Sequence, residues 1–248
     1  MIDILAFSPH PDDAEIGCGG TLALAVQQGK QVAIVDLTAG ESGTCGTPAL
    51  RAQEKSRATQ LLGVSKRVQL RLPDSAVGSD SAHQQPIINI LRQLRPHVVL
   101  APFHEADRHP DHAAAGKLVR EACFLAGVAK VGKGKPHRPA WLYHYMLHQP
   151  FTPSFVVDVS AVWAQKWAAI LAYESQFGAG EAAEKTTAIS QPHFLRFLEA
   201  RAVYYGGLVG TAYGEAYYAA GPIGLDRLPM GNEGEENGRF APAYKPYL

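Results

Sequence analysis

Short apolar runs alternate with stretches of helical periodicity along the first half of the chain. Residues 2–7, 31–37, 68–72 and 97–102 form apolar runs typical of buried strands. Between them, helical patterns cover residues 20–28, 48–62 and 110–126 and end at glycines, and a fourth helix runs from Pro86 to Pro96. This alternation predicts an α/β fold of the Rossmann-like, doubly wound type, with a mostly parallel sheet.

The second half is more mixed. Residues 141–147 and 154–159 read as two further strands, residues 160–173 and 192–205 as helices, and residues 177–187 as a loop. From residue 226 onward all periodicity is lost. We therefore predict a single domain over residues 1–225, followed by an irregular C-terminal tail over residues 226–248.

Composition and charge exclude several classes of function. The 248 residues are 46% hydrophobic, which suffices for a large core, and 23 basic residues balance 23 acidic ones. A net charge of zero argues against binding to nucleic acid or to an anionic membrane surface. Three cysteines without a CxxC pair, no signal-peptide pattern and no bilayer-length apolar stretch predict a soluble, cytoplasmic protein.

Two similar clusters of titratable residues follow the first and the fourth predicted strand. The first is SPHPDDAE (residues 8–15) and the second is HEADRHPDH (residues 104–112). An N-cap role accounts for one aspartate in each cluster, Asp107 in the second, but it does not account for the histidines. In a doubly wound sheet the first and fourth strands are neighbours, so both clusters are expected to meet at the carboxyl edge of the sheet.

Imidazoles and carboxylates without thiolates are suited to zinc or another divalent metal. The two clusters offer six candidate groups: His10, Asp12, Asp13, His109, Asp111 and His112. A three-ligand site needs fewer, so the others are available as general base, general acid or orienting groups, and spacing alone leaves the assignment open. The glycines at positions 17, 19 and 20 do not form GxGxxG, which disfavours dinucleotide binding.

The stretches AFSPHPDDAEIGCGG, DLTAGESGTCGT, DRHPDH and YESQF resemble the PIG-L/LmbE-like family of zinc N-deacetylases, and the likeness extends over residues 2–225. Within the family the chain most resembles the enzymes of bacillithiol biosynthesis. The resemblance implies that His10, Asp13 and His112 bind the metal, which would be Zn²⁺, with Fe²⁺ or another divalent ion as alternatives.

The same resemblance implies roles for three neighbouring residues. Asp12 would be the general base, and His109 the electrostatic partner or general acid, with Asp111 orienting His109. One departure from the family pattern is Ala106, which is inserted between Glu105 and Asp107. This insertion precedes the ligands and bears on how Arg108 approaches the substrate.

The implied reaction is hydrolysis of the acetamide of N-acetyl-α-D-glucosaminyl L-malate, which gives acetate and the free amine. Arg51, Arg108 and Arg138 would bind the substrate, because a guanidinium grips a carboxylate in a bidentate manner. Alternatives are a mycothiol-type or chitooligosaccharide deacetylase and a sugar- or nucleotide-binding module without turnover. The resemblance also implies a homo-oligomer, with a hexamer as one form.

Overall fold

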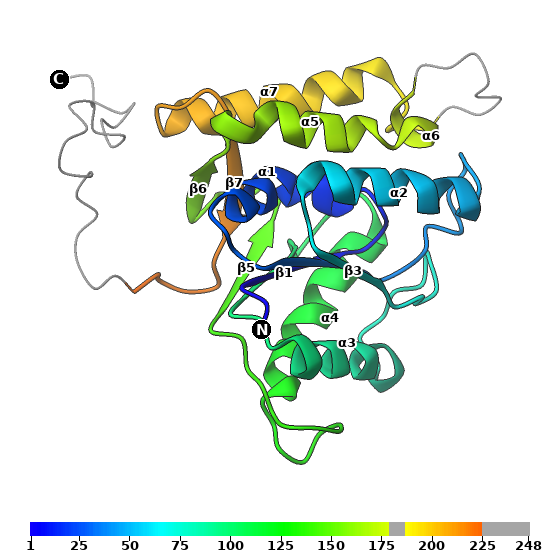
Figure 1. The fold of residues 1–248 in the computed structure, drawn as a ribbon, viewed down its shortest axis with the longest axis vertical. Helices are drawn as coiled ribbons and strands as arrows, with labels where there is room; N and C mark the ends of the chain where they lie inside the picture. The colour runs from blue at the N-terminus through cyan, green and yellow to red at the C-terminus, as the bar shows by residue number, and fades with distance from the viewer. Residues whose placement is uncertain (179–186, 225–248) are drawn as a thin grey trace.

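A seven-stranded sheet with the order β3-β2-β1-β4-β5-β7-β6 lies at the centre of the computed structural model, which describes residues 1–178 and 187–224 (Figure 1). Its parallel part consists of β1 (Ile4–Ser8), β2 (Val32–Asp36), β3 (Lys66–Gln69), β4 (Val98–Pro102) and β5 (Trp141–Tyr145). The predicted α/β class and the order of the first four strands are confirmed.

Helices cover both faces of the sheet (Figure 1). One face carries α1 (Asp13–Gln27) and α2 (Pro48–Leu62), with η1 (Ser160–Val162), α5 (Trp163–Leu171), α6 (Glu174–Phe177) and α7 (Pro192–Leu208) beyond them. The other face carries α3 (Ser81–Leu94) and α4 (Pro110–Ala126).

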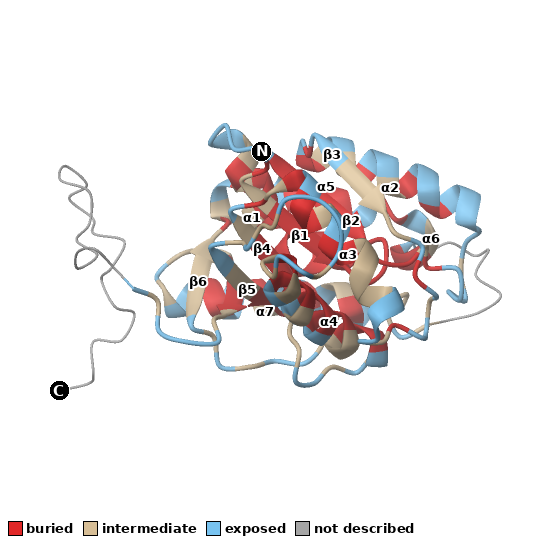
Figure 2. Cartoon of the chain, turned by 90° about the horizontal axis from the view of Figure 1, so that it is seen from below, coloured by how far each residue is buried: buried red, intermediate tan, exposed pale blue. Residues whose placement is uncertain are grey.

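The strands divide their side chains between these two layers. Ala6 and Ile34 pack on the side of α1, whereas Leu5, Phe7 and Val35 pack on the side of α3 and α4. Because both faces are covered, the strands are buried on both sides, and buried residues gather at the centre of the molecule (Figure 2). This explains why the central strands β1, β2 and β4 are almost continuously apolar rather than alternating.

Two predicted helix starts are wrong. α1 begins at Asp13, not at residue 20, and thus includes the glycine-rich segment. α3 begins at Ser81, where the Asp80 side chain accepts hydrogen bonds from the backbone N–H groups of Ala82 and His83, so Pro86 lies inside the helix. The bounds predicted for the helices over residues 48–62 and 110–126 are confirmed.

One strand was missed. β7 (Gly214–Tyr218) pairs antiparallel with β5 and with β6 (Phe155–Asp158), and so connects β6 to the parallel part of the sheet. The sequence GEAYY begins with a glycine and a glutamate, so it lacks the apolar run that marks β1, β2 and β4. Within the sheet it brings the carboxylate of Glu215 into the protein interior.

Two sequence predictions extend beyond the described residues. The domain boundary at residue 225 and the tail over residues 226–248 lie outside them, as do residues 179–186 of the predicted loop. Over the described part of the chain, no helix combines the length and the apolar character needed to span a membrane.

Candidate active site

The two titratable clusters meet at the carboxyl edge of β1 and β4. β1 and β4 are hydrogen-bonded neighbours, so the loop after β1 and the start of α4 lie side by side. The His10 ring lies 4.7 Å from the His109 ring and 5.5 Å from the His112 ring, measured between centroids. Residues about a hundred positions apart therefore share one site, as the strand order predicts.

Two imidazole nitrogens lie close to one carboxylate oxygen in this site, and His10, His109 and His112 each offer a ring nitrogen within 4.8 Å of the other two. Asp13 Oδ2 lies 3.1 Å from His10 Nδ1 and 3.3 Å from His112 Nε2. All three side chains are buried, so their charges are poorly screened by water. Two imidazole nitrogens and one carboxylate oxygen are a donor set typical of a catalytic divalent metal with an open coordination position.

The remaining ring nitrogen of each histidine faces a carboxylate. His10 Nε2 lies 3.1 Å from Asp74 Oδ1 and 3.2 Å from Asp111 Oδ2, and His112 Nδ1 lies 2.9 Å from Asp107 Oδ1. Such contacts select the tautomer and orient the ring of a metal-binding histidine. The residues present therefore fit a divalent metal.

The carboxylates also determine the charge of the histidines. Burial by itself would lower the pKa of His112, but Asp13 and Asp107 raise it to about 9. Burial likewise disfavours the charged form of His10, yet its carboxylate partners raise the pKa of His10 well above the usual value. The surroundings are thus strongly negative and favour a cation at this position.

Asp12 occupies an unusual backbone conformation beside these potential metal-binding atoms. Its φ of 121° lies in a region that side chains rarely adopt, and such strain costs about 1–3 kcal/mol. The side chain is buried, and Arg51 Nη2 lies 3.3 Å from Asp12 Oδ2. Burial raises the pKa of Asp12 to about 7, while Arg51 acts in the opposite direction.

His109 is the N-cap residue of α4. Its Nδ1 accepts a hydrogen bond of 3.2 Å from the backbone N–H of Asp111, which leaves the proton of the neutral ring on Nε2. Burial, together with the neighbouring His10 and His112, lowers the pKa of His109. A neutral imidazole with a donating Nε2–H therefore lines the cavity.

One prediction for this cluster is wrong in its contacts. Asp107 does not cap α4, since His109 does so, and Asp107 instead holds the ring of His112. Asp111 contacts the His109 ring through its backbone N–H, while its carboxylate faces His10. It accepts hydrogen bonds from the backbone N–H groups of Ser75 and Val77, which hold it in that direction.

A cavity of about 250 Å³ opens over the site. Arg51 and Arg108 line it, together with the loop after β2 and residues near α6. Besides the clusters, the described residues lining this cavity include Ser42, Gly43, Thr44, Asp74, Ser75, His148, Gln176 and Ile189.

Arg138 is not brought to this cavity. It precedes β5 and therefore lies at the amino edge of the parallel strands, opposite the site. There its guanidinium lies 4.8 Å from the centre of the Phe124 ring and donates to the Phe124 carbonyl. The structure therefore does not bring Arg138 to the cavity, and the substrate-binding role expected for it stays a prediction.

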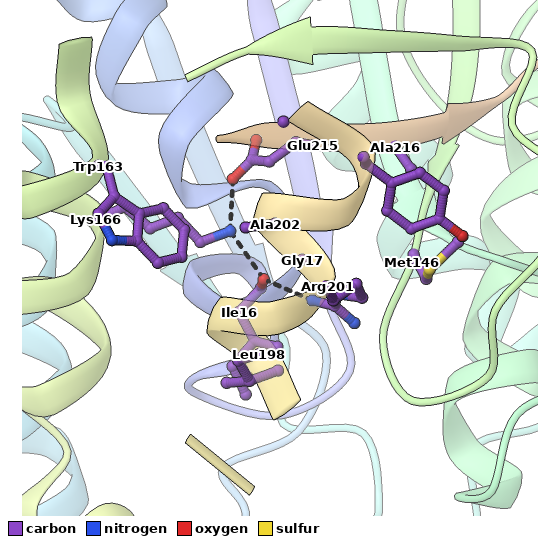
Figure 3. Close-up of a pocket in the computed structure, with 12 residues that line it drawn as sticks. Ile16, Gly17, Met146, Trp163, Lys166, Leu198, Arg201, Ala202, Glu215 and Ala216 are labelled. Atoms are coloured by element: carbon purple, nitrogen blue, oxygen red, sulfur yellow. Dashed lines mark hydrogen bonds and ion pairs between the residues drawn. The ribbon is translucent and has the colours of Figure 1, made fainter. Parts of the chain in front are cut away.

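A buried ion pair holds the middle of α1, whose first turn carries Asp13. Glu215 Oε1 accepts from Lys166 Nζ at 2.6 Å and from the backbone N–H of Gly20 at 2.8 Å. Lys166 and Arg201 both donate to the carbonyl of Ile16, as Figure 3 shows. This carbonyl is the one that a regular helix pairs with the N–H of residue 20.

The glycines of α1 allow this close packing. A Cβ at Gly20 would lie 2.8 Å from Val159 Cβ and 2.9 Å from Glu215 Oε1, and one at Gly17 would overlap the ring of Tyr145. The glycine-rich segment therefore serves helix packing, which agrees with the argument against dinucleotide binding.

Two residues of the site were missed by the sequence analysis. Asp74 follows β3 and contacts His10, and His148 follows β5 and stacks on His112 with ring centroids 5.1 Å apart. The signal available was their position, since both come shortly after the carboxyl end of a parallel strand.

Known proteins resemble this chain in sequence and in fold. A family model described as PIG-L, GlcNAc-PI de-N-acetylase, matches residues 5–123. The diacetylchitobiose deacetylase of Thermococcus kodakarensis is 31% identical over 227 residues, which cover 86% of this chain and 80% of that protein. The chain therefore belongs to the PIG-L family of deacetylases.

Two further similarities qualify this assignment. The crystal structure of the conserved protein TT1542 from Thermus thermophilus is 40% identical, with a TM-score of 0.84, and the match covers 93% of this chain and all of that chain. A Bacillus anthracis protein named "Probable N-acetyl-alpha-D-glucosaminyl L-malate deacetylase 2" is 30% identical over 131 residues, covering 48% of this chain and 58% of that protein. Because this match covers only about half of the chain, it gives only modest support to a particular similarity with the enzymes of bacillithiol biosynthesis.

Proposed function

We propose that the chain is a metal-dependent N-deacetylase that hydrolyses the acetamide of an N-acetylglucosamine conjugate. The observation that carries this proposal is the convergence of His10 Nδ1, Asp13 Oδ2 and His112 Nε2 beneath a cavity that Asp12 and His109 also line. The diacetylchitobiose deacetylase and the malate-conjugate deacetylase among its relatives support the class of substrate.

His10, Asp13 and His112 would hold the metal, which we propose to be Zn²⁺, with Fe²⁺ as the alternative for the same ligands. A bound divalent cation supplies positive charge that polarises the amide carbonyl and makes water more acidic. Asp74, Asp111 and Asp107 act as positioning residues, because each faces the far nitrogen of a metal-binding imidazole.

Asp12 and His109 would act on the reacting atoms. The Asp12 carboxylate accepts a proton from water as the oxygen of that water bonds to the amide carbon. His109 donates a hydrogen bond through Nε2 to the carbonyl oxygen, on which negative charge develops. When the C–N bond breaks, the proton held by Asp12 passes to the amine nitrogen, which leaves acetate and the free amine.

The two arginines at the cavity, Arg51 and Arg108, indicate which group the N-acetylglucosamine of the substrate carries. Arg51 Nη2 donates to the carbonyl of Pro11 at 2.6 Å, and Nη1 donates to the carbonyl of Gly40 at 3.4 Å. Together with the Asp12 contact these bonds engage its guanidinium, so we assign Arg51 to the support of Asp12. Arg108 is exposed at the cavity and is the better candidate for contact with substrate.

The malate conjugate nevertheless stays a prediction to be tested beside diacetylchitobiose. The homo-oligomeric state, a hexamer included, also stays a prediction, and light scattering coupled to size-exclusion chromatography measures it. A cytoplasmic location likewise stays a prediction.

The direct test is acetate release by the purified protein from diacetylchitobiose and from the N-acetylglucosamine conjugates of malate and inositol. Asp12→Asn is expected to lower kcat by roughly 10²- to 10⁴-fold, the usual contribution of a general base. Asp80→Asn is the matched control, because Asp80 caps α3 away from the site and asparagine caps equally well.

Ligand binding without acetate release from any of these amides would favour the binding-module alternative. Undiminished acetate release by Asp12→Asn would contradict the role assigned to Asp12.

A further inference from the structure

A second cavity adjoins the active-site cavity. We call it the annex; its volume is about 270 Å³, and its lining residues are Arg108, His148, Gln149, Pro150, Phe194 and Phe197. Arg108 and His148 line both cavities, so the two are continuous along these side chains. The annex is therefore open to a part of the substrate that extends beyond the acetamide-bearing sugar.

Aromatic rings form one wall of the annex. Phe194 is buried, and its ring centroid lies 5.6 Å from that of His148 and 6.2 Å from that of Phe177, so its position is constrained on both sides. The next aromatic residue of α7, Phe197, is 42% exposed. Arg201 lies 5.8 Å from the Phe197 ring centroid and supports that ring from within the protein.

The annex suits an uncharged ring better than a dicarboxylate. The C–H face of a pyranose is apolar and packs on flat aromatic rings, while its hydroxyls need hydrogen-bonding partners. The guanidinium of Arg108 and the amide of Gln149 are such partners at the annex. Among the described residues that line it, Arg108 is the sole permanent cation, whereas malate carries two carboxylates.

The two cavities are also similar in size, about 250 Å³ and about 270 Å³. If the first takes one N-acetylglucosamine ring, as the proposed function requires, the second has room for a ring of the same kind. We propose that the annex binds a second pyranose ring and that the preferred substrate is an N-acetylated disaccharide. This inference rests on the proposed function and specifies its substrate.

Calorimetric titration of the full-length, Zn²⁺-loaded Asp12→Asn protein tests the annex without turnover. Diacetylchitobiose is expected to bind about tenfold more tightly than N-acetylglucosamine, the factor that one aromatic contact supplies. Phe197→Leu keeps an apolar side chain but removes the flat ring, and it is expected to abolish most of this advantage. Phe197→Tyr keeps the ring and is expected to retain the advantage.

Tyr204→Leu is the matched control, because Tyr204 is a 61% exposed aromatic residue of the same helix and does not line the annex. Equal affinities for the two sugars, no measurable binding of the disaccharide, or an advantage that survives Phe197→Leu would overturn the proposal. Tighter binding of the malate conjugate than of the disaccharide would do the same.

Acetate release by the wild-type protein separates this inference from the function on which it rests. No release from any amide refutes the proposed function. Release from both sugars with the same kcat/KM, together with equal affinities, refutes the annex alone.

Discussion

Asp107→Ala removes a carboxylate that organises one side of the proposed metal centre. Asp107 Oδ1 lies 2.9 Å from His112 Nδ1 and 3.1 Å from His148 Nδ1, and the carboxylate also accepts from the backbone N–H groups of His109, His148 and Gln149. Burial would raise the pKa of Asp107, but hydrogen bonds from His112 and His148 hold it well below the usual value. The group is therefore ionised and accepts from both rings.

The size of the effect follows from this role. Without Asp107, the His112 ring loses the partner that selects its tautomer and holds Nε2 toward Asp13. Loss of such a partner lowers metal affinity by about 10- to 100-fold. This corresponds to about 1.4–2.7 kcal/mol of binding free energy.

Competition with a chelator of known affinity measures the change. Asp107→Ala and the wild-type protein are titrated well below their melting temperatures, so that the comparison concerns folded protein. Glu105→Ala serves as control, since Glu105 is an exposed acidic residue two positions earlier. Zn²⁺ affinity equal in Asp107→Ala and the wild type would refute the reasoning that assigns Asp107 to His112.

Three further predictions concern stability. Arg67→Ala removes the guanidinium that pairs with the buried carboxylates of Glu15 and Asp36, and it should lower the free energy of unfolding by about 3–5 kcal/mol. Arg57→Ala at an exposed ion pair should cost less than about 1 kcal/mol; urea unfolding compares the two variants, and equal losses would contradict the account. Burial lowers the pKa of His144 to about 4, so the imidazole takes up a proton more readily in the unfolded chain than in the folded one. The folded protein is therefore fully stabilised above pH 6.5 and loses this stability as the pH falls toward 4. The wild type should thus lose up to about 3 kcal/mol more than His144→Asn between these pH values, and parallel stability curves would argue against this. Lys166→Met leaves the buried Glu215 carboxylate unpaired and should destabilise the protein by about 3–5 kcal/mol. Adding Glu215→Gln should recover part of this loss in thermal melts, and further destabilisation by the second change would contradict the prediction.

The position of the site could be predicted from the sequence because general rules connect strand order to strand ends. Apolar runs defined β1 and β4, and the doubly wound order placed them side by side. The repeated His-Pro-Asp pattern then indicated which loops carry the chemistry. Each step used many residues at once, so an error at one position did little harm.

The residues around the clusters could not be predicted in this way. Asp74 and His148 are single polar residues in loops, and only the folded chain shows that they contact His10 and His112. Arg138 was assigned to substrate binding by resemblance, but its place before β5 keeps it away from the described cavity. Contacts between single residues depend on three-dimensional packing that periodicity does not describe.

The start of α1 was missed for a related reason. Glycine has a low helix propensity, so the helix was predicted to begin only at Gly20, after Gly17 and Gly19. In the structure, Glu215 accepts from the N–H of Gly20, and Lys166 donates to the carbonyl of Ile16. Tertiary contacts from β7 and α5 therefore outweigh the local propensity.

The central claim is that one divalent cation, held by His10, Asp13 and His112, is required for amide hydrolysis. Metal-stripped protein titrated with Zn²⁺ tests this most directly when bound metal and acetate release from diacetylchitobiose are followed together. We expect no acetate release at the start, and a parallel rise of both quantities that ends at one Zn²⁺ per chain. Full acetate release before any metal is added would contradict the claim.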